Sequence, residues 1–448
     1  MERTDLQTQN AYQKPVNLRN MMRFALPTIA MSVFMSFYTM VDGLFVSNLI
    51  GTNALSAINL TAPVIALVTA ISTMLATGGS AAIMKKMGEG KDKEAREDFT
   101  TLIIVNVIVG LIMGAIGYLC MDLIFSHMDI TADVLTYCID YLSHYLLFTI
   151  PILLMNNFSL YLIASGKSSL SFICSVGGGV ANMVLDYVLI KVMNMGIGGA
   201  AIATGLGYSV TAVVGLIVFA GRKNLLYFEK PVWRFEVLKK VMTNGCSEMA
   251  TALVTGITTL VFNWTMLRYV GQDGVAAITI IMYVLMFVSS LFSGYSYGIA
   301  PMISYYYGEQ HHEKLKKLIR TSLMIIAVIS ISSLSLSIAI TEPLVSIFTG
   351  PDHPVYALAV TGNRICSLAL LFIGFNIFAS GVFTALNNGM VSAILAFSRS
   401  FVFMIVCLLL LPILFGVTGI WLANPLAELL SIILAAVMFL KHKKRYQY

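Results

Sequence analysis

Long apolar segments separated by short polar turns recur along the whole chain. Each is about 20 residues or longer, which is enough to cross the hydrocarbon core of a bilayer as a helix. Alternating patterns typical of membrane-spanning strands are absent from the sequence. The pattern predicts an all-α polytopic membrane protein with twelve transmembrane helices, at residues 21–48, 54–84, 99–121, 131–164, 168–190, 198–220, 241–268, 275–305, 318–341, 355–385, 390–414 and 417–440.

Composition agrees with this pattern. Of 448 residues, 58% are hydrophobic and only 11% are charged, whereas charged residues make up about a quarter of a typical soluble domain. The polar segment 1–20 has no apolar region of the kind found in a cleaved signal peptide. The six cysteines are scattered among apolar segments without metal-binding spacing, so we interpret them as small buried residues.

Lys and Arg residues predict the orientation of the helices. Of the 28, 24 fall on the side of the membrane that holds the two terminal segments and the even-numbered loops. The odd-numbered loops carry acidic residues instead, such as Asp122 and Asp273. The positive-inside rule therefore places both termini in the cytoplasm and the protein in the cell membrane. The net charge of +6 reflects this topology and contact with anionic lipid, not binding to nucleic acid.

The sequence repeats itself weakly at a shift of about 220 residues. IGTNALSAI at 50–58 aligns with VGQDGVAAI at 270–278, and Gly88-Glu89 aligns with Gly308-Glu309. Each half contains six spans, so both halves begin on the same side of the membrane. We expect two pseudo-symmetric six-helix lobes around a central cavity. The predicted divisions are a tail at 1–20, a lobe at 21–220, a cytoplasmic linker at 221–240, a second lobe at 241–440 and a basic tail at 441–448.

A set of polar side chains lies within spans of the N-terminal half. Asn182 and Asp186 are four residues apart, on one face of a helix. Asp42 on the first span and Thr204 on the sixth fall at a similar depth, in the outer half of the membrane. The repeat offers an internal control, because packing common to both halves would preserve the set. The equivalent residues are Phe262, Val402, Val406 and Asn424, so the set belongs to the N-terminal half alone.

The chemistry of this set suggests a cation site. Two carboxylates in a low-dielectric lobe cannot both remain ionised cheaply, so one should hold a proton or pair with a cation. Carboxylate, amide and hydroxyl oxygens are also suitable ligands for a small hard cation such as Na⁺. Asp42, Asn182, Asp186 and Thr204 are therefore the predicted site for H⁺ or Na⁺, and they are the metal ligands if the ion is Na⁺. The alternative is a polar group that only packs helices together.

Other charged residues inside predicted spans have two interpretations each. Asp140 and His144 lie four apart, and His144 is equivalent in the repeat to Arg364. These three could face a cavity or form structural ion pairs. Glu248 and Glu428 are candidates for a cavity in the second lobe.

Two further residues bear on these candidates. Arg399 could neutralise Glu428. Pro27, within the first span, is either a fixed kink or a hinge.

No catalytic motif is present. The sequence lacks a Walker sequence, HExxH and GxSxG. We therefore expect a protein that is not an enzyme and that uses no cofactor apart from a coupling ion.

Several of these features resemble the multidrug and toxic compound extrusion (MATE) family. They are the twelve spans in two bundles, Pro27, VDGLFVSNLIG around Asp42, the GEG and GEQ loops, and NMVLDYVLI followed by GIGGAAIAT. The resemblance implies cation-coupled antiport of organic cations and similar drugs. It also implies that Asp42, Asn182, Asp186 and Thr204 form an N-lobe cation site, and that the first helix bends at Pro27.

Two other functions remain open at this point. One is a flippase for lipid-linked precursors, although such relatives often have fourteen spans. The other is a membrane receptor or scaffold that transports nothing, which would gain little from buried carboxylates. For a transporter we expect small-molecule substrates and membrane lipids as partners, no nucleic acid, and a monomer.

Overall fold

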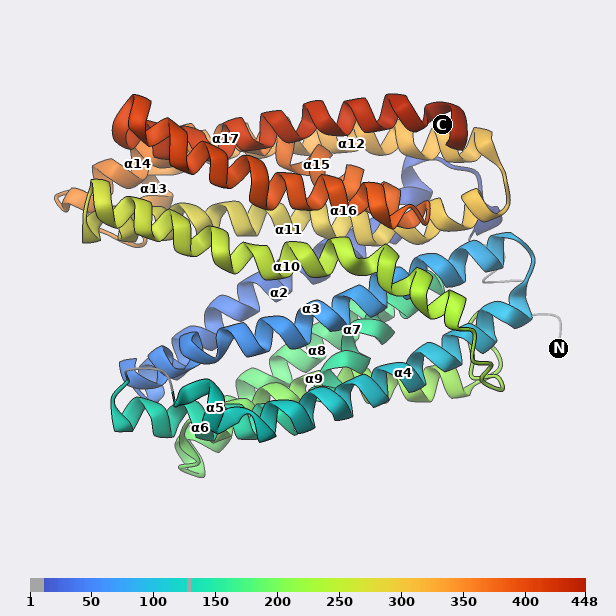
Figure 1. The fold of residues 1–448 in the computed structure, drawn as a ribbon, viewed down its shortest axis with the longest axis horizontal. Coiled ribbons are helices and arrows are strands. Elements are labelled where there is room, and N and C mark those ends of the chain that lie inside the picture. Colours follow the sequence, from blue (N-terminus) through green and yellow to red (C-terminus); the bar gives the residue numbers. More distant parts are fainter. Residues whose placement is uncertain (1–11, 127–129) are drawn as a thin grey trace.

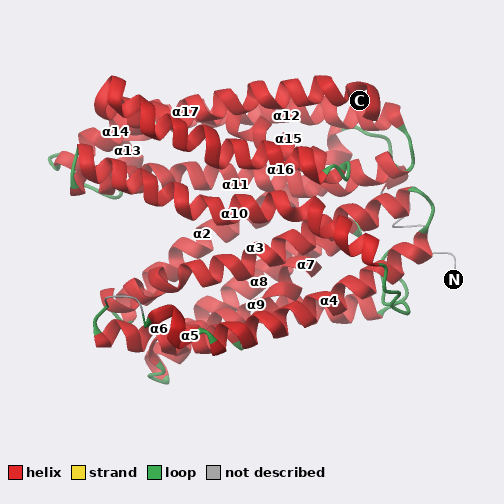
Figure 2. Ribbon diagram, viewed as in Figure 1, coloured by secondary structure: helices red, strands yellow, loops and turns green. Residues whose placement is uncertain are grey.

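The computed structural model describes residues 12–126 and 130–448. Within these ranges the chain is helical, with short loops gathered at the two ends of the helices (Figure 2). The helices of the first half are α2 (Leu18–Leu49), α3 (Thr52–Gly88), α4 (Asp92–Leu119), α5 (Met121–Phe125), α6 (Ala132–Leu146), α7 (Thr149–Ala164), α8 (Ser168–Asp186), η1 (Tyr187–Val192) and α9 (Gly196–Ala220). Those of the second half are α10 (Phe235–Tyr269), α11 (Gln272–Gly308), α12 (His312–Ala339), α13 (Thr341–Ser346), α14 (Pro354–Cys366), η2 (Ser367–Ala369), α15 (Leu370–Ala385), α16 (Gly389–Phe397), η3 (Ser398–Phe403) and α17 (Met404–Tyr446).

The number of spans follows from these lengths. Ten helical runs in the described residues are long and apolar enough to cross a membrane, and α6 with α7, bent by 55°, forms an eleventh. The last run, Gly389–Tyr446, has 58 residues, which corresponds to ~87 Å of helix. It contains two helices that meet at Gly416, where φ is 57° and ψ is −136°. The predicted twelve spans are therefore confirmed.

Glycines in the left-handed region mark equivalent turns in the two halves. Gly51 and Gly271, with φ of 122° and 91°, lie in the turn between the first two helices of each half. Gly196 and Gly416, with φ of 59° and 57°, join the last two spans of each half. A residue with a Cβ rarely adopts such angles, so glycine is retained at both members of each pair. These turns lie 220 residues apart, as the sequence repeat predicts.

The helices form two bundles, α2 to α9 and α10 to α17 (Figure 1). The start of α2, the C-terminal end of α17 and the 221–234 connection lie at the same end, which we call the terminal end (Figure 1). The bundles adjoin there and diverge toward the opposite end (Figure 1). Across the interface α3 packs along α10, and α2 packs along α11. The lobe interface is therefore built by the first two helices of each lobe.

Glycine contacts close the terminal end. A Cβ added to Gly88 would lie 2.0 Å from the Tyr305 carbonyl oxygen, and one added to Gly308 would lie 2.1 Å from the Lys85 carbonyl oxygen. The 220-residue repeat exchanges these two contacts, so they lie across the pseudo-two-fold axis. Only glycine permits such close backbone approach. The ends of α3 and α11 thus interlock.

Tyr12 reinforces this closure. Its side chain is 1% exposed, and its hydroxyl donates to the Ala164 carbonyl oxygen at 2.5 Å in the first lobe. The Tyr306 hydroxyl of the second lobe donates to the Tyr12 carbonyl oxygen at 2.9 Å. The Tyr12 ring also stacks on Tyr305 with 4.8 Å between centroids. The segment before α2 therefore connects the two lobes directly.

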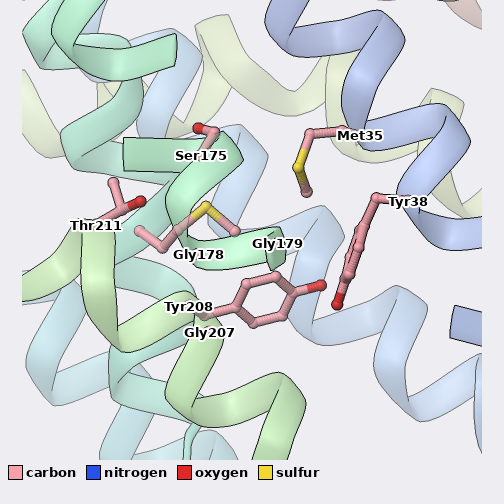
Figure 3. A pocket seen from close by; sticks show the side chains of 9 residues that line it. Met35, Tyr38, Ser175, Gly178, Gly179, Gly207, Tyr208 and Thr211 are labelled. Carbon is pink, nitrogen blue, oxygen red and sulfur yellow. The ribbon is translucent and has the colours of Figure 1, made fainter. Parts of the chain in front are cut away.

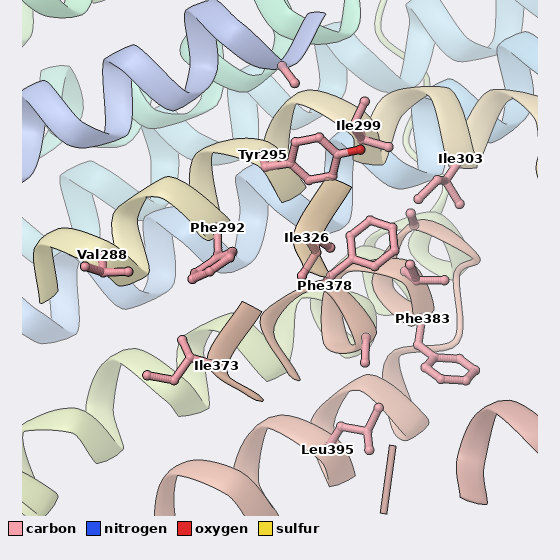
Figure 4. Packing of buried hydrophobic residues seen from close by; sticks show 14 of the residues in the cluster. Val288, Phe292, Tyr295, Ile299, Ile303, Ile326, Ile373, Phe378, Phe383 and Leu395 are labelled. Carbon is pink, nitrogen blue, oxygen red and sulfur yellow. The ribbon is translucent and has the colours of Figure 1, made fainter. Parts of the chain in front are cut away.

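The core of the second lobe has a helical period. Val288, Phe292, Tyr295, Ile299 and Ile303 follow one face of α11 and are buried against α12 and α15 (Figure 4). Their spacing of three or four residues keeps them on one side of the helix. Buried aromatic and branched side chains therefore fill the centre of this lobe, and polar groups within it need partners of their own.

Candidate functional site

Asp42 of α2 and Asp186 of α8 are brought together in the N-terminal lobe. Their carboxyl groups lie within hydrogen-bonding reach of each other, and Asp186 is fully buried. Two ionised carboxylates are both acceptors and cannot bond to each other, so the contact requires a proton or a cation between them. The two residues are 144 positions apart, and only the packing of α2 against α8 places them in contact.

Asn182 and Thr204 complete the predicted set. Asn182 lies one helical turn before Asp186, and its amide donates to the Thr204 hydroxyl on α9 at 3.3 Å. Both side chains are at most 6% exposed. This bond uses the NH₂ group of Asn182 and leaves its carbonyl oxygen available. The structure thus assembles all four predicted residues, while their role stays a prediction.

Unpaired oxygens characterise this cluster. Within the described part of the chain, the buried atoms Asp42 Oδ1, Asn182 Oδ1, Asp186 Oδ1 and Asp186 Oδ2 receive no hydrogen bond. Buried polar atoms without a partner are uncommon, because each one loses its hydration without compensation. Four such oxygens in one place match the requirements of a bound proton or a small hard cation.

Three tyrosines surround the carboxylates. Tyr38, Tyr141 and Tyr208 all lie close enough to Asp42 to interact with it electrostatically. None of the three was predicted from the sequence. Tyr38 precedes Asp42 by one turn and Tyr208 follows Thr204 by one turn, so helical spacing could have identified these two. Tyr141, which is 5% exposed on α6, had no such signal because it approaches from another helix.

A cavity of about 280 Å³ lies beside the cluster, toward the middle of the lobe. Figure 3 shows Tyr38 and Tyr208 at its edge, with their hydroxyls directed toward each other. Met35 and Met155 line it as well. A Cβ on Gly178 would lie 2.5 Å from the Gly207 carbonyl oxygen, so α8 and α9 approach backbone to backbone along its wall. Its walls are therefore mainly apolar and aromatic.

The local structure changes directly after Asp186. The helix widens into the π-helix η1, and the chain then turns at Gly196. Such widened turns occur often at functional sites, because they shift the side chains before them relative to a regular helix. Gly196 thus joins η1 to α9, while Gly198 and Gly199 lie within the first turn of α9.

Comparison with known proteins decides the family. The MatE family model matches residues 27–188 and again residues 249–410, which together make up most of the chain.

This chain belongs to the MATE family.

The two matches correspond to the two halves of the sequence repeat. The chain is 25% identical over 429 residues to the multidrug export protein MepA of Staphylococcus haemolyticus, covering 95% of this chain and 93% of that protein. It is 24% identical over 434 residues to MepA of Staphylococcus aureus, with 95% and 94% covered.

Solved MATE structures share the fold. A MATE crystal structure in a bent conformation has a TM-score of 0.89 at 22% identity, covering 98% of this chain and 97% of that one. An outward-facing multidrug resistance MATE transporter has a TM-score of 0.88 at 22% identity, with 95% of both chains covered. The present chain therefore has the MATE arrangement of twelve helices in two lobes.

Asp140 and His144 contact each other near the N-terminus of α9. His144 Nδ1 lies 3.2 Å from Asp140 Oδ1, and the Gly198 amide donates to Asp140 Oδ2 at 3.1 Å. A carboxylate at the N-terminus of α9 is favourable because the helix dipole is positive there. Arg364 pairs with Glu342 at 2.7 Å, and both side chains are more than half exposed. Both contacts agree with the ion-pair interpretation, while a cavity role for these residues stays a prediction.

Glu428 is engaged inside the second lobe. Arg399 Nε lies 2.8 Å from Glu428 Oε1, and the Asn376 amide donates to Glu428 Oε2 at 2.7 Å. Glu428 is 3% exposed and does not line the cavity beside the carboxylates, so a cavity position for it stays a prediction. The expected pairing with Arg399 is seen. The carboxylate is satisfied by its own lobe.

Pro27 lies in an unbroken helix. The structure assigns α2 as continuous from Leu18 to Leu49 across Pro27. Proline lacks the amide that would bond to the Arg23 carbonyl oxygen. The Ser168 hydroxyl of α8 lies 3.5 Å from this oxygen and donates to it. The predicted weak point is therefore supported from a neighbouring helix of the same lobe.

Proposed function

We propose that this MATE transporter exports amphipathic, mostly cationic compounds across the cell membrane in exchange for H⁺ or Na⁺. The observation that carries the proposal is the group of unpaired buried oxygens around Asp42 and Asp186. Nothing in a purely structural role would justify the cost of this arrangement, whereas a reversible ion site requires it. Both relatives described above are named multidrug export proteins, which supports the class of substrate.

The charge pattern supports the direction of transport. With the Lys- and Arg-rich terminal end in the cytoplasm, the interlocked helices close the cytoplasmic side and the lobes diverge outward. An ion then reaches Asp42 and Asp186 from outside, where the gradient supplies it. Loading removes the repulsion between the two carboxylates. The ion must bind the two conformations with different affinities, because equal binding shifts no equilibrium.

A path from the ion site to the lobe interface runs along α2. Asp42 and Pro27 lie on the same helix, and a Cβ on Gly294 of α11 would meet Ile29 Cα at 2.6 Å. Gly298 approaches Thr28 Oγ1 in the same way, at 2.4 Å. Bending of α2 at Pro27 would therefore act directly on the other lobe. The loaded transporter would reset inward and release its ion to the cytoplasm.

Drug counterflow in proteoliposomes with an imposed pH or Na⁺ gradient tests the proposal. The double variant Asp42→Asn, Asp186→Asn should lose gradient-driven transport, while drug binding in detergent partly survives. Glu342→Gln, an exposed carboxylate remote from the site, is the control and should transport at the wild-type rate. Wild-type rates in the double variant would refute the mechanism.

A further inference from the structure

One face of α7 carries polar side chains on successive turns, which we call the α7 row. Its members are Asn157, Tyr161 and Ser165, the last of which directly follows the final residue of the helix. Their spacing of four residues keeps them on one side of the helix. All three are 0% exposed. The eight residues from Asn157 to Ser165 advance ~12 Å along the axis, so the row leads through the interior of the first lobe to the terminal end.

Each member of the row has a buried oxygen without a partner. Asn157 Oδ1, the Tyr161 hydroxyl and Ser165 Oγ form no hydrogen bond within the part of the chain that the structure describes. Gly79 of α3 admits the tyrosine hydroxyl, because a Cβ there would lie 2.4 Å from it, and the equivalent position in the second lobe is Ile299. Buried polar groups of this kind are typically satisfied by internal water molecules. Three of them in one row therefore indicate a line of internal water.

The start of the row lies among other polar side chains next to the ion site. Asn157 Nδ2 donates to Asn106 Oδ1 on α4 at 2.7 Å, and Asn156 Nδ2 donates to Ser72 Oγ on α3 at 3.0 Å. Met155, one position before these amides, lines the cavity beside the carboxylate pair. The cavity, the amide groups and the row thus follow one another from the ion site toward the terminal end.

The other end of the row lies beside a contact that bridges the two lobes. The carbonyl oxygen of Ala164, directly before Ser165, accepts the Tyr12 hydroxyl. Tyr12 is bound in turn by the Tyr306 hydroxyl of the second lobe. Separation of the lobes at the terminal end would break one of these contacts. The row is therefore sealed in the present conformation and would open to the cytoplasm when the lobes part there.

The second lobe has no counterpart of this arrangement. All five polar positions, three in the row and two that contact its start, are replaced by apolar residues or glycine. The equivalents of Asn157, Tyr161, Ser165, Ser72 and Asn106 are Ile377, Gly381, Ala385, Phe292 and Ile326. Phe292 and Ile326 belong to the packed core of that lobe (Figure 4). The polar row therefore occurs only in the lobe that contains the carboxylate pair.

We propose that the α7 row holds a file of internal water molecules through which protons leave the N-terminal lobe for the cytoplasm. The proposal rests on the proposed function and specifies the exit route of its ion, which is then H⁺. In each step a water molecule accepts a proton through one hydrogen bond and donates another onward, so one O–H bond breaks for each that forms. The net result is one proton moved from the Asp42–Asp186 pair to cytoplasmic water, and the pair regains one negative charge.

Hydroxyl-radical footprinting of the purified full-length protein in detergent tests for the water. Radicals that X-rays generate from bound water oxidise the side chains next to it. Tyr161 and Tyr295 are both 0% exposed, but the Tyr295 hydroxyl donates to Ser322 at 2.9 Å in the second lobe. Tyr161 should be oxidised about fivefold faster than Tyr295, because only Tyr161 has a neighbouring water. Equal rates for the two tyrosines would overturn the proposal.

The double variant Tyr161→Phe, Ser165→Ala tests the proton route. It deletes two unpartnered hydroxyls, so the protein should fold and bind drug with the wild-type Kd. Under a pH gradient the maximal rate of drug counterflow should fall about tenfold, and the rate ratio between H₂O and D₂O should rise as proton release becomes limiting. Ser330→Ala is the matched control, since it deletes an unpartnered hydroxyl that is 1% exposed on α12. It should transport at the wild-type rate.

The outcomes separate this route from the proposed function. If the wild type transports under a pH gradient and the double variant matches its rate and isotope effect, the route fails and the function stands. Transport driven by Na⁺ alone would also overturn the route and leave the function intact. If the wild type transports under neither gradient, the function fails and the proton route fails with it, while the footprint still shows whether the row holds water.

Discussion

In the N-terminal lobe, three of the four carboxyl oxygens of Asp42 and Asp186 are buried without a hydrogen-bond partner among the described residues, whereas in the C-terminal lobe Arg399 and Asn376 hold Glu428. Both groups are buried in similar six-helix bundles. The second lobe contains its own cation as an arginine side chain. The first lobe leaves that requirement open, which is why we propose that an ion from outside changes the charge of this carboxylate pair.

The repeat traces this difference to single positions. Arg399 is equivalent to Gly179, and Glu428 is equivalent to Tyr208. Gly179 and Tyr208 line the cavity beside the carboxylates. In the second lobe the two equivalent positions form an ion pair, where the first lobe has a glycine and an aromatic ring. In the second lobe, side chains therefore occupy positions whose equivalents line a cavity in the first lobe.

The largest expected effect concerns transport. Asp42→Asn or Asp186→Asn alone should reduce gradient-driven counterflow to the level of protein-free vesicles, because the ion site loses a ligand and its charge. Glu428→Gln and Glu248→Gln should be milder in maximal rate, since neither belongs to the unpaired set. The comparison between the lobes would be reversed if Glu428→Gln or Glu248→Gln abolished counterflow while Asp42→Asn retained it, with all variants well expressed.

For thermal stability, the change in the C-terminal lobe should have the larger effect and the change in the N-terminal lobe the smaller one. Arg399→Gln leaves Glu428 buried without its cation, and breaking such a pair costs about 3–5 kcal/mol. Thermal unfolding in detergent should therefore shift strongly to lower temperature. Asp42→Asn removes repulsion and should leave the unfolding temperature unchanged or raise it. An equal loss of stability in both variants would show that the two carboxylate groups have the same structural role.

The glycine contacts sharpen the comparison, because both lobes retain them. Gly88→Ala and Gly308→Ala should weaken the terminal-end closure by similar amounts, about 1–3 kcal/mol, since a Cβ would overlap a backbone oxygen. Maleimide labelling of Ser304→Cys on the axis, in a background without the native cysteines, should become faster. Gly177→Ala, where a Cβ meets nothing within 4 Å, is the control. Unequal effects of the two variants would argue against a symmetric closure.

The smallest expected effects are those of Asn182→Ala and Thr204→Ala. Each removes one neutral oxygen and one bond worth about 0.5–1.5 kcal/mol. Coupling should weaken by at most about tenfold, and mainly if Na⁺ is the ion, because a proton needs only the carboxylates. The apparent ion affinity measured under separate pH and Na⁺ gradients distinguishes the cases. Abolished transport under a pH gradient would show that these two residues are essential for proton coupling as well.

The amino-acid sequence determined much of this protein by local rules. Apolar length and period predict the twelve helices, because each span must satisfy its own backbone in a membrane. The repeat predicts paired glycine turns such as Gly51 and Gly271, because both halves build the same hairpin. Asn182 and Asp186 are predictable as one group because four residues make about one helical turn. Their restriction to one lobe follows from the repeat alone.

Tertiary structure alone decided the contacts between helices. Tyr141 reaches the carboxylates from α6, and Asp140 binds the start of α9, where sequence spacing carries no information. The cavity between the lobes, which Glu248 lines, exists only because α3 and α11 meet there. Hydrophobic pattern determines which face of a helix is buried, but several neighbours can satisfy the same face. Which neighbour packs there depends on side-chain shape and on close backbone contacts such as that of Gly88 with Tyr305.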